Sequence, residues 1–208
     1  MITDREAALA MAATYGAGNP TFASLDNAVR VFLSDAPDGS VTVSIEGTHD
    51  PLGWAIDFLA IGVRDREMVH HPSVGMVEAG FLLAAQSVIG AIGPAVAGKR
   101  FNMIGHSLGA ALALLLGALL GDEGHAADAI HAFAPPRVGY DDFLAALKRI
   151  GSAVRAFRFH NDPVPLAPLT LPPLWPYRQV PLIGLGPAPT HALDPADHHY
   201  PNYVNAIS

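Results

Sequence analysis

Residues 101–120 read FNMIGHSLGAALALLLGALL, and this stretch decides the fold. Its first part, Phe101 to Ile104, is a short apolar run that ends at Gly105, which predicts a buried strand. Its last part, Ala110 to Leu120, is apolar throughout and predicts a buried helix. Between them lies GHSLG, a G-x-S-x-G pattern. A strand, a sharp turn and a helix in this order are the context that a nucleophile elbow requires.

The serine of this pattern, Ser107, is the predicted nucleophile. The sharp turn is expected to strain its backbone and to expose its hydroxyl, and side chains two positions away would clash, so Gly105 and Gly109 are needed there. The helix that follows directs free N–H groups and the positive end of its dipole towards a developing anion. A serine hydroxyl also needs an adjacent base that a third group orients.

The rest of the chain alternates predicted strands and helices, which favours an α/β fold with a mostly parallel sheet. Turn residues at 35–39 join the first two strands into an N-terminal antiparallel hairpin. Prolines exclude a regular helix from 163–189. The predicted helices are 4–16, 76–92, 110–120, 141–150 and 197–207, and the predicted strands are 29–33, 41–45, 101–104, 129–134 and 154–159.

The amino-acid composition limits the classes of protein to which this chain can belong. The 208 residues, 50% hydrophobic and 15% charged, predict one domain over residues 1–208 with a real core, and they exclude a disordered chain. The absence of cysteine excludes disulfides, zinc–thiolate sites and a cysteine nucleophile. A net charge of -7 gives no sign of the positively charged surface that binds nucleic acid, so no nucleic-acid partner is expected. No histidine cluster has the spacing of a helical zinc motif, so no metal and no cofactor is expected.

Two segments of the sequence bear on where in the cell the protein is expected. Residues 1–6 have mixed charge and no apolar h-region, so a cytoplasmic protein is expected, with non-classical secretion as the alternative. The stretch from Ala79 to Gly98 carries no charge and is long enough to span a bilayer. It also contains polar residues, glycines and a proline. We therefore interpret it as a packed helix, and a membrane-anchored protein is the alternative.

The acid and the base should follow the serine, because the chain order in hydrolase sheets is serine, acid, histidine. Asp162 directly follows the predicted strand 154–159, and the carboxyl ends of strands are where such groups lie. Pro163 and Pro165 stiffen its loop. The residues alone leave three candidates for the base, His191, His198 and His199.

Ordered blocks surround the elbow. They are IEGT at 45–48 with WAID at 54–57, His70-His71 ahead of Gly80-Phe81, FAPPRVG at 133–139, NDPVP at 161–165, and Asp197-His198 with Tyr203 five residues after the histidine. In these blocks the chain resembles the class 3 lipases, the fungal-lipase-like branch of the α/β hydrolases, and would be a small bacterial-type member. The resemblance runs from about Val41 to the C-terminus. It implies an α/β-hydrolase fold, a mostly parallel central sheet flanked by helices.

The resemblance also implies roles for particular residues. Ser107, Asp162 and His198 would be the catalytic triad, which favours His198 over His199 as the base. The oxyanion hole would be formed by the backbone N–H of Leu108 and by Thr48. Residues 49–58 would form a lid with an apolar underside, able to make transient contact with a lipid interface. The expected substrate contacts are Trp54, His106, Leu166 and Trp175.

The implied activity is that of a carboxylic ester hydrolase, an esterase or lipase that cleaves acylglycerols or similar apolar esters through an acyl-enzyme. The chain departs from the family at Glu46, where arginine is usual, and at Ala134, where glycine is usual. For His106, a packing or hydrogen-bonding role is the alternative to substrate contact. The alternative function is a catalytically silent hydrolase-fold protein that binds an apolar ligand.

Overall fold

The computed structural model describes residues 2–25, 27–47, 67–168, 170, 176–190 and 192–207. Four of the predictions made above lie outside these residues. They concern the oxyanion residue Thr48, the lid 49–58 with Trp54, the substrate contact Trp175, and His191 as a candidate base.

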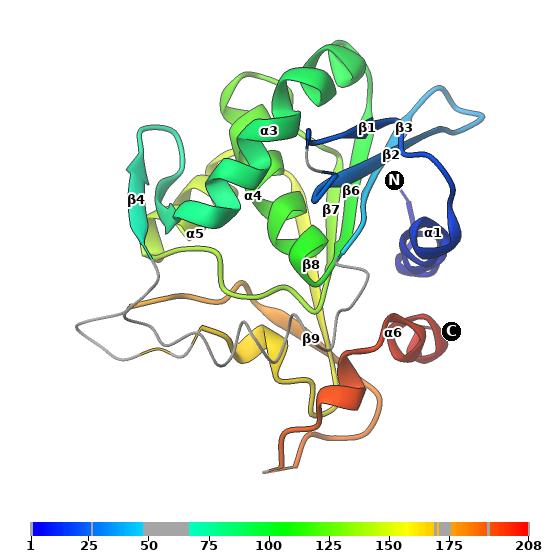
Figure 1. The fold of residues 1–208 in the computed structure, drawn as a ribbon, viewed down its shortest axis with the longest axis vertical. Coiled ribbons are helices and arrows are strands. Elements are labelled where there is room, and N and C mark those ends of the chain that lie inside the picture. Colours follow the sequence, from blue (N-terminus) through cyan, green and yellow to red (C-terminus); the bar gives the residue numbers. More distant parts are fainter. Residues whose placement is uncertain are drawn as a thin grey trace.

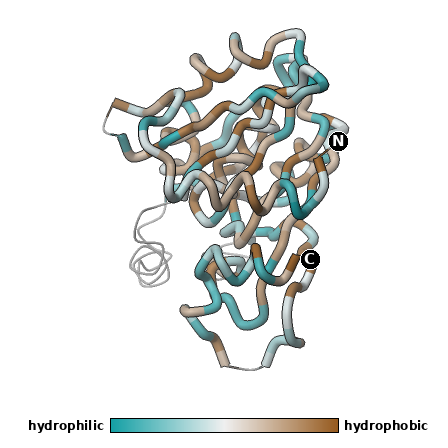
Figure 2. The backbone as a smooth tube through the Cα atoms, turned by 90° about the vertical axis from the view of Figure 1, so that its right-hand side faces the viewer, coloured by the Kyte–Doolittle hydropathy of each residue, from teal (hydrophilic) through white to brown (hydrophobic). Residues whose placement is uncertain are grey.

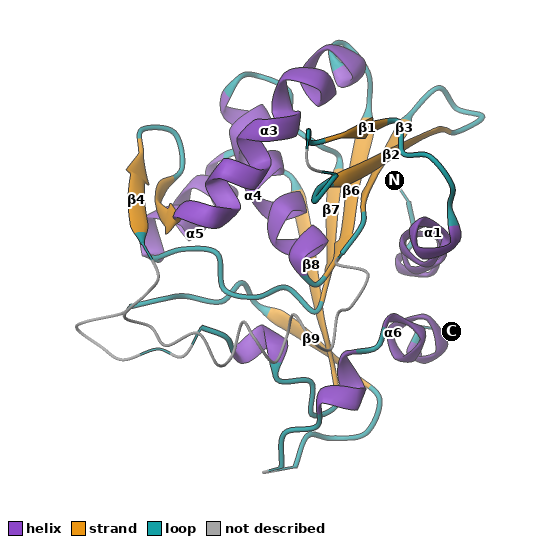
Figure 3. Cartoon of the chain, in the orientation of Figure 1, coloured by secondary structure: helices purple, strands orange, loops and turns teal. Residues whose placement is uncertain are grey.

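Within the described residues a seven-stranded sheet runs in the order β1-β2-β3-β6-β7-β8-β9. β2 pairs antiparallel with both β1 and β3, and the pairs from β3 to β9 are parallel (Figure 3). The predicted sheet with its N-terminal antiparallel hairpin is therefore confirmed. The strands are β1 Phe22–Ala23, β2 Arg30–Asp35, β3 Val41–Ile45, β6 Phe101–His106, β7 Ala129–Phe133, β8 Ala153–Phe159 and β9 Leu182–Leu185, with a separate pair β4 Met68–His71 and β5 Gly75–Glu78.

Helices cover both faces of the sheet (Figure 1). One face carries α3, α4 and α5, and the other carries α1 and α6, which lie side by side although they come from opposite ends of the chain. The helices are α1 Asp4–Gly16, α3 Ala79–Val96, α4 Leu108–Asp122, α5 Asp141–Arg149 and α6 Tyr200–Ala206, with the 3-10 turns η2 Val164–Leu166 and η3 Pro195–His198.

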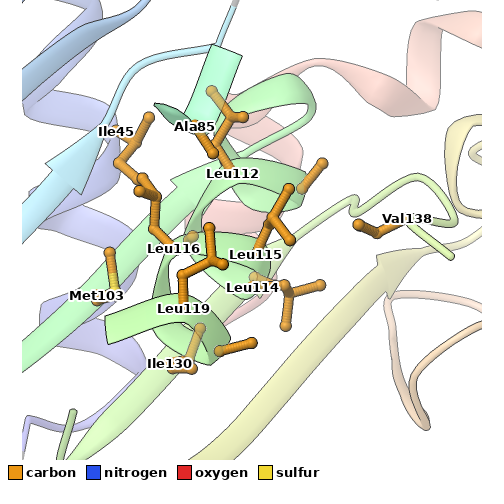
Figure 4. Packing of buried hydrophobic residues seen from close by; sticks show 14 of the residues in the cluster. Ile45, Ala85, Met103, Leu112, Leu114, Leu115, Leu116, Leu119, Ile130 and Val138 are labelled. Carbon is orange, nitrogen blue, oxygen red and sulfur yellow. The ribbon is translucent and has the colours of Figure 1, made fainter. Parts of the chain in front are cut away.

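The elbow helix α4 lies between the sheet and α3. Every residue from Gly109 to Leu120 is buried, as the uninterrupted apolar pattern predicts. Leu112 and Leu116 lie in one cluster with Met103 of β6 and Ile130 of β7 (Figure 4). Burying a leucine contributes roughly 1.5–3 kcal/mol of transfer free energy. The helix that follows Ser107 is thus the centre of the core, and Figure 2 shows brown, hydrophobic stretches of chain running through this body.

The prediction of a helix over 76–92 is wrong at both ends. The β4–β5 hairpin occupies the residues up to Glu78, whose carboxylate then caps α3 by accepting the Phe81 N–H at 2.8 Å. The helix continues through Pro94 to Val96. A proline in the last turn removes one hydrogen bond, whereas the buried side chains of Ile92 and Val96 hold this end of the helix on the core.

The proline-rich stretch contains a strand that the sequence does not predict. β9 pairs in parallel with β8, and Ile183 lies opposite Phe157. The strand is four residues long, includes a glycine, and occupies the edge of the sheet, where nearby prolines are tolerated. Such a strand gives almost no signal of its own in the sequence.

Among the described residues, α3 is the one helix with the length and apolar character of a membrane span. A single helix of this kind is weak evidence for a membrane segment, because the core helix of a soluble protein has the same properties. In the structure, Phe81, Ala85 and Ile92 of α3 pack into the main hydrophobic cluster with α4. This packing is consistent with the interpretation as a packed helix.

Ala134 has a left-handed backbone conformation, and its effect on stability can be tested by substitution. It follows β7 with φ of 53°, in the left-handed region, and its N–H donates to the Phe157 carbonyl at 2.9 Å. That conformation costs a residue with a Cβ roughly 1–2 kcal/mol, and glycine loses roughly 0.4–1 kcal/mol more entropy on folding. Ala134 is also fully buried, and removing its methyl group costs roughly 0.8 kcal/mol. We expect Ala134→Gly to lower the free energy of unfolding by about 1–2 kcal/mol less than the same substitution at a buried alanine in extended backbone, as measured by urea denaturation.

The matched control for this substitution is Ala132→Gly, in the extended part of β7. There glycine relieves no strain, so the free energy of unfolding should fall. Equal losses of stability in the two variants would contradict the strain expected from the left-handed backbone of Ala134.

Candidate active site

The turn between β6 and α4 holds Ser107 in a strained conformation, with φ of 58° and ψ of -124°. A Cβ added to Gly105 would lie 2.1 Å from the Gly109 carbonyl oxygen, and one added to Gly109 would lie 2.3 Å from the Ile45 carbonyl oxygen. Both glycines are therefore required by close backbone contacts, as predicted. The expected exposed hydroxyl is wrong, because Ser107 is fully buried by the groups packed around it.

Ser107, His198 and Asp162 lie in one hydrogen-bonded line. The hydroxyl oxygen of Ser107 is 2.9 Å from Nε2 of His198, and Nδ1 of His198 is 2.9 Å from Oδ2 of Asp162. All three side chains are fully buried. His199, the neighbouring candidate, is exposed and begins α6. The arrangement provides a hydroxyl, a base in contact with it, and a carboxylate that orients the base.

The carboxylate of Asp162 has further partners. Its Oδ1 accepts the Val164 N–H at 2.8 Å, and its Oδ2 accepts a hydrogen bond from the Tyr203 hydroxyl. Burial and the nearby charge of Asp162 raise the pKa of Tyr203 well above its usual value, so the phenol stays protonated and donates. Tyr203 was part of a sequence block, but its contact with Asp162 could not be read from the sequence.

The loops that carry the acid and the base are tied to each other. The Asn161 N–H donates to the carboxylate of Asp197 at 3.0 Å, and the Asp194 N–H donates to the Asn161 carbonyl at 3.1 Å. The side chain of Asn161 also binds Thr190, with its Nδ2 2.9 Å from the threonine hydroxyl. Neighbours of Asp162 thus fix the segment that ends in His198.

The start of α4 provides one site for a developing anion. The Ser107 carbonyl accepts the N–H groups of Ala110 and Ala111 at 3.0 and 3.2 Å. The N–H of Leu108, in the first turn, belongs to the set that a helix leaves without an internal partner. It is adjacent to Ser107, which is the position that an oxyanion donor would have if this serine is the nucleophile. Gly47, the last described residue before Thr48, lies beside this turn, because a Cβ on it would be 2.8 Å from the His106 carbonyl oxygen.

A model of the family described as lipase (class 3) matches residues 42–171. The chain belongs to the class 3 lipase family. The secreted mono- and diacylglycerol lipase A proteins of Penicillium cyclopium and Penicillium camembertii are each 44% identical to this family member over 69 residues. Those residues are 32% of this chain and span only 22% of either relative. The relatives named here are fungal, so the expected bacterial-type origin is not borne out.

Solved structures support the fold of this class 3 lipase family member. A crystal structure of an N225Q mutant of MDLA from Penicillium cyclopium matches with a TM-score of 0.68 and 21% identity over 93% of this chain and 81% of that one. A Rhizomucor miehei triacylglyceride lipase matches with a TM-score of 0.66 and 18% identity over 79% and 64% of the two chains. At these identities the likeness establishes the α/β-hydrolase fold alone.

Two of the expected substrate contacts lie within the described residues of this lipase-family chain. His106 is fully buried, with its ring against Tyr15, His198 and Tyr203, which agrees with the packing alternative and gives no support to substrate contact. Leu166 is partly exposed in η2, and its carbonyl accepts a hydrogen bond from Arg137. Its contact with substrate stays a prediction. Within the described ranges no group of three or more His, Asp and Glu side chains is placed to hold a metal ion.

Glu46, the departure from the family's arginine, is part of a buried ion pair that the sequence did not reveal. Its carboxylate lies 2.6 Å from a guanidinium nitrogen of Arg30, and the two side chains are 1% and 11% exposed. Arg30 also donates to the Gly18 carbonyl. The pair thereby joins β2, the end of β3 and the loop after α1. The acid at 46 is compensated by a base on the neighbouring strand.

We expect Arg30→Met to lower the free energy of unfolding by about 3–5 kcal/mol, because it removes the guanidinium group that lies 2.6 Å from the buried carboxylate of Glu46. Urea denaturation measures the change. The control is Arg178→Met, which breaks an ion pair whose members, Arg178 and Asp141, are 44% and 74% exposed. Such exposed pairs contribute about 0–1 kcal/mol. Equal losses in the two variants would contradict a special role for the Arg30–Glu46 pair.

Proposed function

We propose that this chain is a serine hydrolase that cleaves carboxylic esters, an esterase or lipase acting on acylglycerols or similar apolar esters. The observation that carries the proposal is the buried hydrogen-bonded line of Ser107, His198 and Asp162. Membership of the class 3 lipase family supports it, as does the printed name of the Penicillium relatives, which describes them as mono- and diacylglycerol lipases. No cofactor takes part in this chemistry.

In the proposed mechanism the Ser107 oxygen attacks the ester carbonyl carbon while Nε2 of His198 takes the hydroxyl proton. Asp162 stabilises the imidazolium that forms. The negative charge on the carbonyl oxygen is held by the Leu108 N–H, with Thr48 as the second proposed donor. Collapse of this intermediate breaks the ester C–O bond, and the alcohol leaves with the proton from His198. The acyl group then remains on Ser107.

The second half of the reaction reverses these roles with water. His198 takes a proton from the water, whose oxygen attacks the acyl carbon, and the proton is returned to Ser107 as the carboxylic acid departs. Trp54, Leu166 and Trp175 are proposed to line the acyl groove, and residues 49–58 are proposed as a lid that meets lipid. The expected cytoplasmic location stays a prediction, and the Penicillium relatives are named as secreted proteins.

A panel of p-nitrophenyl esters with two to sixteen acyl carbons tests the proposal, together with a diacylglycerol emulsion and a fluorophosphonate probe. We expect turnover of esters and covalent labelling of Ser107, located by peptide mass spectrometry. Absence of both turnover and labelling would favour a catalytically silent protein that binds an apolar ligand. The profile across chain lengths would define the substrate class, because the groove volume sets it.

A further inference from the structure

A path of buried and partly buried side chains leads from the end of β3 to His198. Tyr15, in the last turn of α1, places its hydroxyl 2.8 Å from Nδ1 of His106. The backbone of Gly47 lies beside the same phenol oxygen. A Cβ on Gly47 would lie 2.5 Å from that oxygen, so the contact is close. Tyr15 thus lies between the strand end that precedes Thr48 and the residue that precedes the nucleophile.

The path continues from His106 to the base. The rings of His106 and His198 stack with centroids 4.8 Å apart and planes at 28°. Tyr203 meets the His106 ring edge-on at 5.5 Å. Both histidines are fully buried. Because the plane of His198 determines where its Nε2 points, the ring stacked on it contributes to the 2.9 Å contact with Ser107.

The protonation states along this path follow from burial. Burial, followed by the charge of Glu46, raises the pKa of Tyr15 above its usual value, so the phenol keeps its proton. Burial, followed by the charge of His198, holds the pKa of His106 well below its usual value, so that ring stays neutral. In the arrangement proposed here, the protonated phenol donates to Nδ1 of His106, which lies 2.8 Å away. The ring proton of His106 then belongs on Nε2.

We propose that Tyr15 and His106 are positioning residues for the ester hydrolysis proposed above. They link the end of β3 to the plane of the His198 ring, so that the oxyanion side and the base side of the site keep a fixed separation. A neutral ring is suited to this place, because His198 becomes positively charged during the reaction and a second charge beside it would oppose that step. The inference rests on the proposed function.

Tyr15→Phe tests the link by removing one oxygen atom. We expect kcat for p-nitrophenyl butyrate to fall about tenfold with KM within twofold, because a small misplacement of catalytic groups affects the chemical step more than binding. The control is Tyr200→Phe, since the Tyr200 ring stacks on Tyr15 at 4.4 Å and 3°. Its kcat should stay within twofold of the wild type. Equal kcat values in the two variants would overturn the proposal.

A second measurement does not depend on activity. Imidazole nitrogen-15 NMR of the wild type, assigned with His106→Gln, should show His106 neutral, with its proton on Nε2, from pH 5 to 8. The Nδ1 resonance should shift in Tyr15→Phe and not in Tyr200→Phe. A proton on Nδ1, or a doubly protonated ring at pH 7, would overturn the proposal.

The experiments distinguish a failure of the proposed function from a failure of the positioning role. If the wild type neither turns over esters nor reacts with the fluorophosphonate, the proposed function is wrong and the positioning role is wrong with it. If the wild type is active and Tyr15→Phe keeps the full kcat, the positioning role alone is wrong.

Discussion

Ser107→Ala is expected to lower kcat/KM for p-nitrophenyl butyrate by about 10⁵-fold and to abolish labelling by a fluorophosphonate. Removal of a triad serine leaves only the catalysis that the oxyanion donors and binding supply. The fold should be retained, because alanine and serine have similar backbone preferences at a φ of 58°. Initial rates with purified protein, and thermal unfolding followed by circular dichroism, measure both effects.

A matched control for the nucleophile is Ser87→Ala on α3. The Ser87 hydroxyl donates to the Ala84 carbonyl of its own helix and lies on the exposed surface. This variant should keep the wild-type rate. Undiminished turnover in Ser107→Ala would exclude Ser107 as the nucleophile.

The second large effect separates two adjacent histidines. His198→Ala should lower kcat by about 10⁴- to 10⁶-fold, because it removes the group proposed to take the proton from Ser107. His199→Ala should change kcat less than about threefold, since its side chain is exposed where α6 begins. Stopped assays across pH 6 to 9 with both variants give the comparison. Loss of the rate in His199→Ala with retention in His198→Ala would reverse the assignment.

Ser107 and Asp162 could be identified from the sequence as candidate site residues because their signals are local. Ser107 lies in a pattern flanked by an apolar strand and an apolar helix, and Asp162 follows directly on a strand. The base has no such local signal. His191, His198 and His199 lie close together in the sequence, and the choice among them depends on how the last loop turns back to the sheet. Only the family resemblance favoured His198, which is the one that contacts Ser107 in the structure.

The supporting residues could not be predicted because their partners are distant in the sequence. Tyr15 lies 91 residues from His106, and Arg30 lies 16 residues from Glu46 on another strand. A tyrosine at the end of an alanine-rich helix looks like any other surface or core residue. Glu46 was noticed only as a departure from the family, and its partner emerged from the antiparallel register that brings β2 beside β3.

The helices and strands show the same contrast between signals that are local in the sequence and contacts between distant residues. The long buried helix and the alternating strands carry strong periodic signals, whereas β4, β5 and β9 are four residues each. Short strands form because neighbouring elements pair with them, and this pairing is a tertiary effect. The N-terminus of α3 depended on the cap supplied by Glu78, which an apolar pattern cannot reveal.

The position of α4 between the sheet and α3 affects the order in which parts of the molecule unfold on heating. Amide protons of α4 should exchange with solvent only when the whole chain unfolds, because no smaller opening exposes a helix buried on every side. His198 lies instead in a four-residue turn before the short helix α6, an arrangement that opens at lower free energy. Activity should therefore disappear reversibly a few degrees below the main unfolding transition, while the strained serine turn is still intact.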